Sequence, residues 1–172
     1  MSAFRYQIVQ EILRILQKEV DFTPDPIDAE TADPIPPENM TIRKTVAQRP
    51  INKGYVAEQF PMVRVTFPFK EDVPIDAGTN ERDEYRYRFL IQIIDSDNYE
   101  PEMNLATYFL WQERICRKFN YKELTDDGNL RACVALCTAF SVDTVDETQW
   151  VKEENFKAGV GLVVRTWMTR NP

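Results

Sequence analysis

Two groups of acidic residues carry the side chains best suited to binding a divalent cation or hydrolysing a bond. Glu71, Asp72 and Asp76 form the first group, and Asp126 and Asp127, which precede a glycine, form the second. Neither spacing matches a calcium-binding loop. Acidic residues beside glycine and proline are typical of solvated turns. We favour solvated turns, while a metal-dependent hydrolase that uses these carboxylates stays open as an alternative.

The sequence lacks the residues that most other catalytic systems need. It contains no histidine, so it has no Ser-His-Asp or Cys-His nucleophile system and no histidine general base. It also has no GxxxxGK[ST] phosphate loop. The GVG at 159–161 lies in a predicted strand with no helix after it, which favours a bulge or close packing over a dinucleotide fingerprint. We predict that the protein is not an enzyme and holds no cofactor and no metal.

The three cysteines, Cys116, Cys133 and Cys137, stand in apolar surroundings. An odd number in such surroundings indicates small core residues of a chain made in a reducing cytoplasm. Three cysteines at this spacing, without histidine, do not form the paired knuckles of a zinc site.

The acidic composition limits the partners that the chain can bind. Its 172 residues suffice for one domain, and its hydrophobic fraction of 43% suffices for a core. With 28 Asp and Glu against 21 Lys and Arg, the net charge is −7. That charge argues against a general nucleic-acid binder, because such a protein needs a basic face. An acidic wall would instead repel phosphate and let DNA slide past.

No secretion signal or membrane segment is expected. Charges interrupt the apolar pattern of MSAFRYQIVQEILRILQKEV, so this stretch lacks the apolar core of a signal peptide. No apolar run approaches the roughly 20 residues of a membrane span.

Two amphipathic helices are predicted, over residues 3–20 and 100–119. The first has apolar residues at every fourth position, widened into a stripe by neighbours: Phe4, Ile8, Val9, Ile12, Leu13, Ile15, Leu16 and Val20. In the second, the row expected to face the core is Leu105, Phe109, Gln112, Cys116 and Phe119, flanked by Tyr108 and Ile115.

Four strands are predicted, over residues 60–69, 84–95, 130–145 and 156–169, because apolar residues alternate there. The first two are expected to form a hairpin whose tip, KEDVPIDAGTNERDE, projects into solvent. Within the third, CVALCTAF could be helical or extended. The resulting order, α-β-β-α-β-β, predicts one α+β domain with two helices packed on a mainly antiparallel sheet of four or more strands.

Residues 21–58 are predicted to be one long irregular segment. Six of the eleven prolines lie there, and its first half, DFTPDPIDAETADPIPPE, is acidic with no basic residue. The charge then changes sign in TIRKTVAQRPINK. A loop longer than about 15 residues in a compact domain is usually functional or disordered.

Aromatic residues offer two more candidates. The row Tyr85, Tyr87 and Phe89 could stack nucleic-acid bases, although a strand face turned to the core is the favoured interpretation. Trp111 lies off the apolar row of its helix, and Trp150 lies in the acidic TVDETQWVKEEN. Exposed tryptophans are preferred anchors of interfaces.

This layout resembles the tail-terminator (tail-completion) and neck connector proteins of tailed bacteriophages. The resemblance rests on five elements in order, which are FRYQIVQEILRILQKEV, FPMVRVTF, YRYRFLIQIID, a helix ending in ERICRKF, and GVGLVVRTWM. It is a resemblance of pattern over most of the chain, with residues 21–58 as an insertion.

The resemblance implies a structural virion protein. Such proteins form homo-oligomeric rings, commonly of six subunits, that cap the tail tube and join it to the neck and head. DNA passes through the central channel without specific binding. The implied partners are other copies of the chain, the tail tube or sheath protein, and neck or head-completion proteins, with no membrane. The implied location is the virion tail or neck, after synthesis in the host cytoplasm.

Within this interpretation, residues 21–58 form an arm that reaches a neighbouring subunit or the neck. Proline stiffens an extended arm and lowers the entropy lost on docking. The candidate interface residues are Ile27, Ile35, Arg43, Lys44, Arg49, Lys53, Trp111 and Trp150. The candidate channel-facing acidic residues are Glu71, Asp72, Asp76, Glu81 and Asp83. A disordered surface loop is the alternative for 21–58.

Two further functions stay open at this stage. One is a head-closure or adaptor connector of the phage neck, which differs from a terminator only in its neighbours. The other is a soluble bacterial binding domain unrelated to phage.

Overall fold

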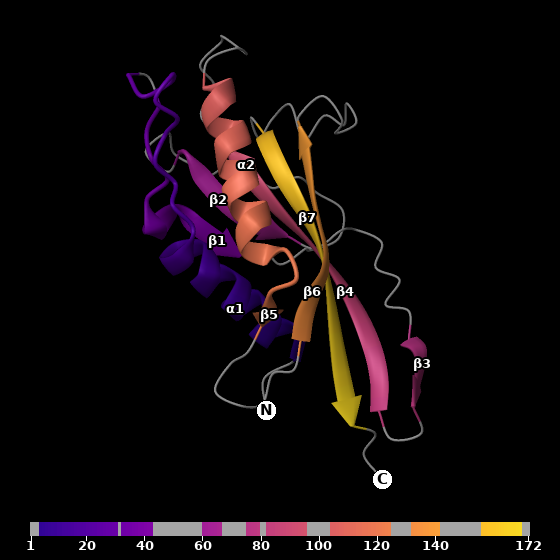
Figure 1. The fold of residues 1–172 in the computed structure, drawn as a ribbon. Helices are drawn as coiled ribbons and strands as arrows, with labels where there is room; N and C mark the ends of the chain where they lie inside the picture. The colour runs from indigo at the N-terminus through magenta and orange to yellow at the C-terminus, as the bar shows by residue number, and fades with distance from the viewer. Residues whose placement is uncertain are drawn as a thin grey trace.

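The computed structural model describes residues 4–30, 32–42, 60–66, 75–79, 82–95, 104–124, 132–141 and 156–169. Figure 1 shows two helices lying on one face of a twisted sheet. The elements follow in the order α1 (Phe4–Glu19), η1 (Pro37–Asn39), β1 (Met40–Ile42), β2 (Met62–Thr66), β3 (Ile75–Thr79), β4 (Arg82–Ile94), α2 (Leu105–Phe119), β5 (Glu123–Leu124), β6 (Ala132–Ser141) and β7 (Phe156–Thr169).

Helix α1 forms where the apolar stripe predicted it. The stripe residues from Ile8 to Val20 are buried, and the prolines at 24 and 26 prevent the helix from continuing. Glu11 is also buried, and Arg14 Nε and Nη2 donate hydrogen bonds of 2.7 Å to its two carboxylate oxygens. No helix in the described part of the chain is long and apolar enough to cross a membrane.

The seven strands form one sheet in the order β1-β2-β4-β7-β6-β5, and β3 pairs with β4 outside this path. Strand β7 lies at the centre, antiparallel to β4 along nearly its whole length and antiparallel to β6 on its other side. The β1–β2 pair is parallel, and the other pairs are antiparallel. In Figure 1, β4 and β7 run beyond the helices at the end of the sheet where β3 lies.

The core lies between the helices and one face of the sheet. Alternate residues of neighbouring strands meet on this face, as where Val65 pairs with Ile91 and Ile91 with Val160. These side chains are buried in one cluster with the apolar side of α1. Because successive strand residues point to opposite faces, Arg64 and Gln92 lie on the other face. Both are buried as well, so the β2–β4 corner is covered on both sides.

The structure confirms an α+β domain with two helices on a mainly antiparallel sheet. The predicted order of elements was incomplete, because β1, β3 and β5 were not expected. Strands β2 and β4 do pair antiparallel. Their connection is not only a projecting tip, however, since Ile75–Thr79 folds back as β3 against the start of β4. The ambiguous CVALCTAF is extended, within β6.

Helix α2 turns a different face to the core from the row expected. Its buried side chains are Thr107, Tyr108, Trp111, Gln112, Ile115 and Phe119. Leu105 and Phe109, the first two members of the expected row, are exposed. The buried face is therefore rotated toward Trp111, for a reason that lies in residues 21–28.

Candidate functional site

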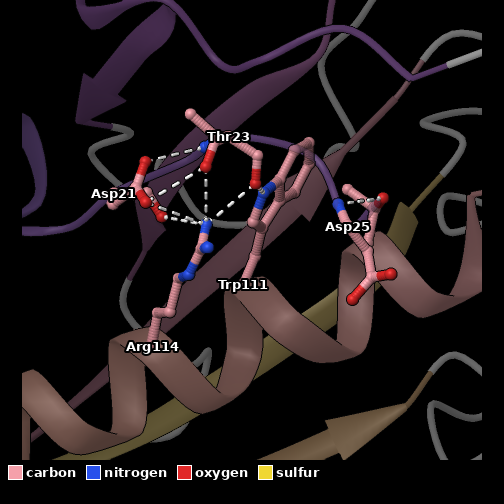
Figure 2. Close-up of polar contacts among 6 residues, drawn as sticks. Asp21, Thr23, Asp25, Trp111 and Arg114 are labelled. Carbon is pink, nitrogen blue, oxygen red and sulfur yellow. Dashed lines mark hydrogen bonds and ion pairs between the residues drawn. The ribbon is translucent and has the colours of Figure 1, made fainter. Parts of the chain in front are cut away.

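Residues 21–28 lie against α2 of the same chain, although the two segments are distant in sequence. The Trp111 indole nitrogen donates a hydrogen bond of 3.0 Å to the carbonyl oxygen of Thr23. Its ring meets the Phe22 ring edge-on at a centroid distance of 6.0 Å. Figure 2 shows Trp111 and Arg114 rising from the helix to this segment. The N–H of a buried tryptophan needs a hydrogen-bond acceptor. Here the acceptor belongs to a segment that the sequence predicts to be irregular.

Arg114 holds the start of the same segment. Its Nη1 donates to the carbonyl oxygens of Asp21 and Thr23, at 2.9 and 2.8 Å. The same nitrogen lies 3.3 Å from Asp21 Oδ2. The backbone N–H and the hydroxyl of Thr23 also donate to the Asp21 carboxylate, each at 3.0 Å. These hydrogen bonds lower the pKa of Asp21, with that from the Thr23 backbone as the largest cause.

The segment also caps the N-terminus of α2. Asp28 Oδ2 accepts a hydrogen bond of 2.7 Å from the backbone N–H of Thr107, in the first turn of the helix. In return, the Thr107 hydroxyl accepts a bond of 3.0 Å from the backbone N–H of Asp25. The first N–H groups of a helix have no partner inside it, and a carboxylate there is favoured by the helix dipole.

These contacts and the burial of the residues that follow place residues 21–30 and 32–42 on their own chain. Phe22, Ile35 and Met40 are buried in the core, and β1 adds an edge to the sheet. The arm that was expected over 21–58 can therefore include only the residues after β1. Residues 43–58 lie outside the described part of the chain, and an arm there stays a prediction.

The structure places the candidate interface residues in different settings. Ile27 is on the surface, with 84% of its area exposed. Ile35 and Trp111 are core residues, so the expectation of a surface role for them is corrected. Arg43, Lys44, Arg49, Lys53 and Trp150 lie outside the described residues.

The candidate acidic residues do not all lie in a loop. Asp76 is a residue of β3, in register with Glu84, and Asp83 is a residue of β4, in register with Met168. Glu71, Asp72 and Glu81 lie outside the described residues, as do Asp126 and Asp127. Among the residues that the structure describes, no group of three His, Cys, Asp or Glu side chains could hold a metal ion.

In the part of β4 that pairs with β3, an ion pair joins β4 to β7. Arg165 Nε and Nη2 donate to the two carboxylate oxygens of Glu84, at 2.5 and 2.8 Å. Arg86, which pairs with Arg165 in the ladder, also reaches Glu84 at 3.4 Å. The hydrogen bonds from Arg165 are the main cause of the lowered pKa of Glu84. Glu84 thus offsets the repulsion of two arginines on neighbouring strands.

The strand aromatics and the cysteines have structural surroundings. Tyr87 and Phe89 are buried, which confirms the core interpretation over base stacking. Cys116 of α2 and Cys137 of β6 pack against the core as free thiols. The two thiols are hydrogen-bonded to one another across the α2–β6 interface.

The glycines of GVG lie in the middle of β7. Gly159 and Gly161 pair with Gln92 and Leu90 without a bulge between them. A Cβ added to Gly161 would meet its nearest neighbour, the Thr138 carbonyl oxygen, at an ordinary 3.8 Å. Gly159 has a specific contact, because its carbonyl oxygen accepts a hydrogen bond of 2.8 Å from the Gln112 amide.

Sequence reasoning missed several exposed apolar side chains on α2, the turn after it, and β6. The described residues include six large apolar side chains that are exposed, and four of them belong to α2, the turn after it, and β6. We call these four the α2–β6 border: Leu105, Phe109, Tyr121 and Leu136, exposed by 45%, 45%, 79% and 56%. The available signal was the width of the apolar arc of α2, which runs from Trp111 past Phe119 to Leu105 and Phe109, although a narrower face suffices for a core.

Comparison with known proteins gives no assignment. No protein-family model matches the chain, and no curated protein is significantly similar to it.

Proposed function

We propose that the chain is a structural protein of a tailed-phage virion, a ring-forming tail terminator. In this role it caps the tail tube, joins it to the neck and head, and lets DNA pass through the central channel. Its partners are further copies of the chain, commonly six in a ring, together with tail-tube and neck proteins.

The α2–β6 border is the observation that carries the proposal. Large apolar side chains left exposed on neighbouring elements are one feature of protein interfaces. Here Tyr121 and Leu136 are more than half exposed although they flank a well-packed core. A domain that repeats in a ring needs interface surface of this kind on every copy.

Charge supports the same role. The chain carries a net charge of −7, which suits a channel that DNA must traverse without binding, because basic patches would hold the phosphates. Arg43, Lys44, Arg49 and Lys53 concentrate positive charge in an otherwise acidic chain. Opposite charges on adjacent subunits can set the register between them.

A nonsense mutation in the corresponding phage gene tests the function. We expect filled heads and unjoined tails of abnormal length by negative-stain electron microscopy, with both defects repaired when the chain is supplied in trans. Tails of normal length whose heads leak DNA would contradict the terminator and favour a head-closure connector. Normal, infectious particles would exclude both roles.

The role of the residues after β1 is better tested by reversing their charges than by deleting them. Deleting 21–58 would remove Phe22, Ile35 and Met40 from the core, so loss of assembly could reflect unfolding alone. Changing Arg43, Lys44, Arg49 and Lys53 to glutamate leaves these core residues in place. If the four are part of an intersubunit or neck contact, tail joining falls while the melting temperature stays within about 2 °C of the wild type.

A further inference from the structure

The α2–β6 border surrounds an edge of the sheet. Residues 21–28 cover α2 on the side of Trp111, and the Cys116–Cys137 hydrogen bond holds its other side against β6. Leu105 and Phe109 lie in the same helical row as Cys116, and therefore on the side of β6. Leu136 lies on the opposite face of β6, where it pairs with Val163 next to the inward-facing pair of Cys137 and Leu162. Apolar side chains thus flank β6 on both faces.

Strand β6 is bonded on one side along its length but on the other side only at its start. Strand β7 pairs with it from Ala132 to Ser141. On the far side, β5 pairs with Ala132 and Cys133, and the Lys122 carbonyl oxygen accepts a bond from the Val134 N–H. In the part of the chain that the structure describes, no strand pairs with residues 136–141 on that side.

The sequence of this edge lacks the usual protection against pairing. Soluble proteins protect open edges with charged residues, proline, bulges or covering segments. Strand β6 reads ACVALCTAFS, with no charged residue and no proline. Its one register shift, between Val134 and Leu136, comes before the open stretch. The edge is therefore suited to receive another strand.

We propose that β6 receives β3 of a neighbouring copy of this chain, so that the sheet continues from subunit to subunit. This inference rests on the proposed function. A closed ring requires a head-to-tail contact in which two different surfaces of the chain meet. Strand β3 lies on the opposite side of the central β7 and pairs only with β4 among the described strands. Strand addition gives main-chain hydrogen bonds, and the border supplies apolar contacts around them.

A charge placed beside the edge tests the proposal. Leu136→Lys should raise the concentration needed for half-assembly by at least about tenfold, as for a central interface residue. Tyr6→Lys is the matched control, because Tyr6 of α1 is 47% exposed and lies away from the border. Native mass spectrometry over a concentration series reports assembly, and circular dichroism checks that both variants melt like the wild type. Phe109→Lys provides a second variant in case Leu136→Lys does not fold.

Crosslinking identifies the partner strand. In a background with the three cysteines replaced by alanine and shown to assemble, one chain carries Thr138→Cys and the other Ala77→Cys. A short bismaleimide should join position 138 of one chain to position 77 of the other in the mixture. Crosslinks that join 138 only to 138 would overturn the proposal in favour of a two-fold β6–β6 contact.

Two other results count against the strand contact and separate it from the function. Wild-type assembly that Leu136→Lys and Phe109→Lys both leave unchanged would show that the ring uses another surface. A wild type that stays monomeric at the highest attainable concentration would likewise overturn a direct β6–β3 contact. Neither result changes the expected nonsense phenotype, so the tail-terminator proposal would stand or fall on that phenotype alone.

Discussion

The indole nitrogen of Trp111 lies 3.0 Å from the carbonyl oxygen of Thr23 and donates a hydrogen bond to it, 88 residues back along the chain. Figure 2 shows that Arg114 shares this acceptor from one turn further along the helix. The contact fixes which side of α2 is covered by residues 21–28, while Leu105 and Phe109 on another side are each 45% exposed.

Truncating this tryptophan should be strongly destabilising. Trp111→Ala removes a buried side chain and should lower the free energy of unfolding by about 3–5 kcal/mol, because a cavity remains. Trp111→Phe keeps most of the volume but loses the N–H donor, so a loss of about 1–2 kcal/mol is expected. Urea denaturation followed by circular dichroism measures both. The half-exposed Tyr6, changed to alanine, should shift the free energy by less than about 0.5 kcal/mol. Equal losses in all three variants would contradict a specific role.

The Glu84–Arg165 ion pair should make stability depend on pH. The pKa of Glu84 is lowered in the folded chain, so its contribution is complete above its usual pKa and is lost as the pH falls through the lowered value. Glu84→Gln should therefore reduce the free energy of unfolding at pH 7 by up to about 1 kcal/mol, with the gap to the wild type closing toward about pH 3.

Glu113→Gln is the matched control for that pH dependence. Glu113 also pairs with an arginine, Arg117, but both side chains are mostly exposed. Such pairs contribute little, so this variant should follow the wild-type curve at every pH. A Glu84→Gln gap that is constant from pH 3 to about pH 7 would exclude ionisation of Glu84 as the cause.

The buried contact between Arg64 and Gln92 should matter more than an ordinary amide bond. Arg64 Nε and Nη2 donate to Gln92 Oε1 at 3.1 and 3.0 Å, on a face of the sheet where both residues are buried. Gln92→Leu removes this acceptor from a charged donor and should cost about 1.5–3 kcal/mol. Gln17→Leu, at an exposed position of α1, is the control in the same urea denaturation. A neutral or stabilising Gln92→Leu would show that apolar packing can replace the contact.

The two hydrogen-bonded cysteines should differ in reactivity. The bond between them lowers the pKa of Cys116 and raises the pKa of Cys137. Because the thiolate is the reactive form, iodoacetamide should modify Cys116 first at pH 8, as measured by peptide mass spectrometry. Cys137→Ala should slow modification of Cys116, since the stabilising donor is lost. Cys133→Ala should leave that rate unchanged, and faster labelling of Cys137 than of Cys116 would contradict the assignment.

Local sequence patterns were enough to predict the elements in which buried residues recur with the period of a helix or of a strand. The stripe of α1 and the alternation of β4 and β7 each contain the information needed for a helix or a strand. Strands β1 and β3 were missed because three residues in a proline-rich stretch and five in a turn-rich stretch carry no such period. They become strands by pairing with β2 and β4, which is a tertiary effect.

The surface was harder to predict than the fold. The buried face of α2 depends on Phe22 and Thr23, which no helical pattern connects to Trp111. The helical pattern, in which Trp111 lies off the apolar row, predicts Trp111 at the surface and Leu105 and Phe109 in the core, and the structure shows the reverse. Ile27 did lie at the surface, because it stands in a turn between acidic residues.

The central place of β7 has a consequence for how the chain folds. Strands β4 and β6 do not pair with each other, and each completes its ladder only with β7. During synthesis, β7 leaves the ribosome after β4 and β6. The strands on the β4 side and those on the β6 side therefore stay unjoined until the residues near 169 have emerged. Contacts this distant in sequence slow folding. The uncharged β6 therefore has open hydrogen-bonding groups on both sides during synthesis, which makes this interval the one most exposed to aggregation.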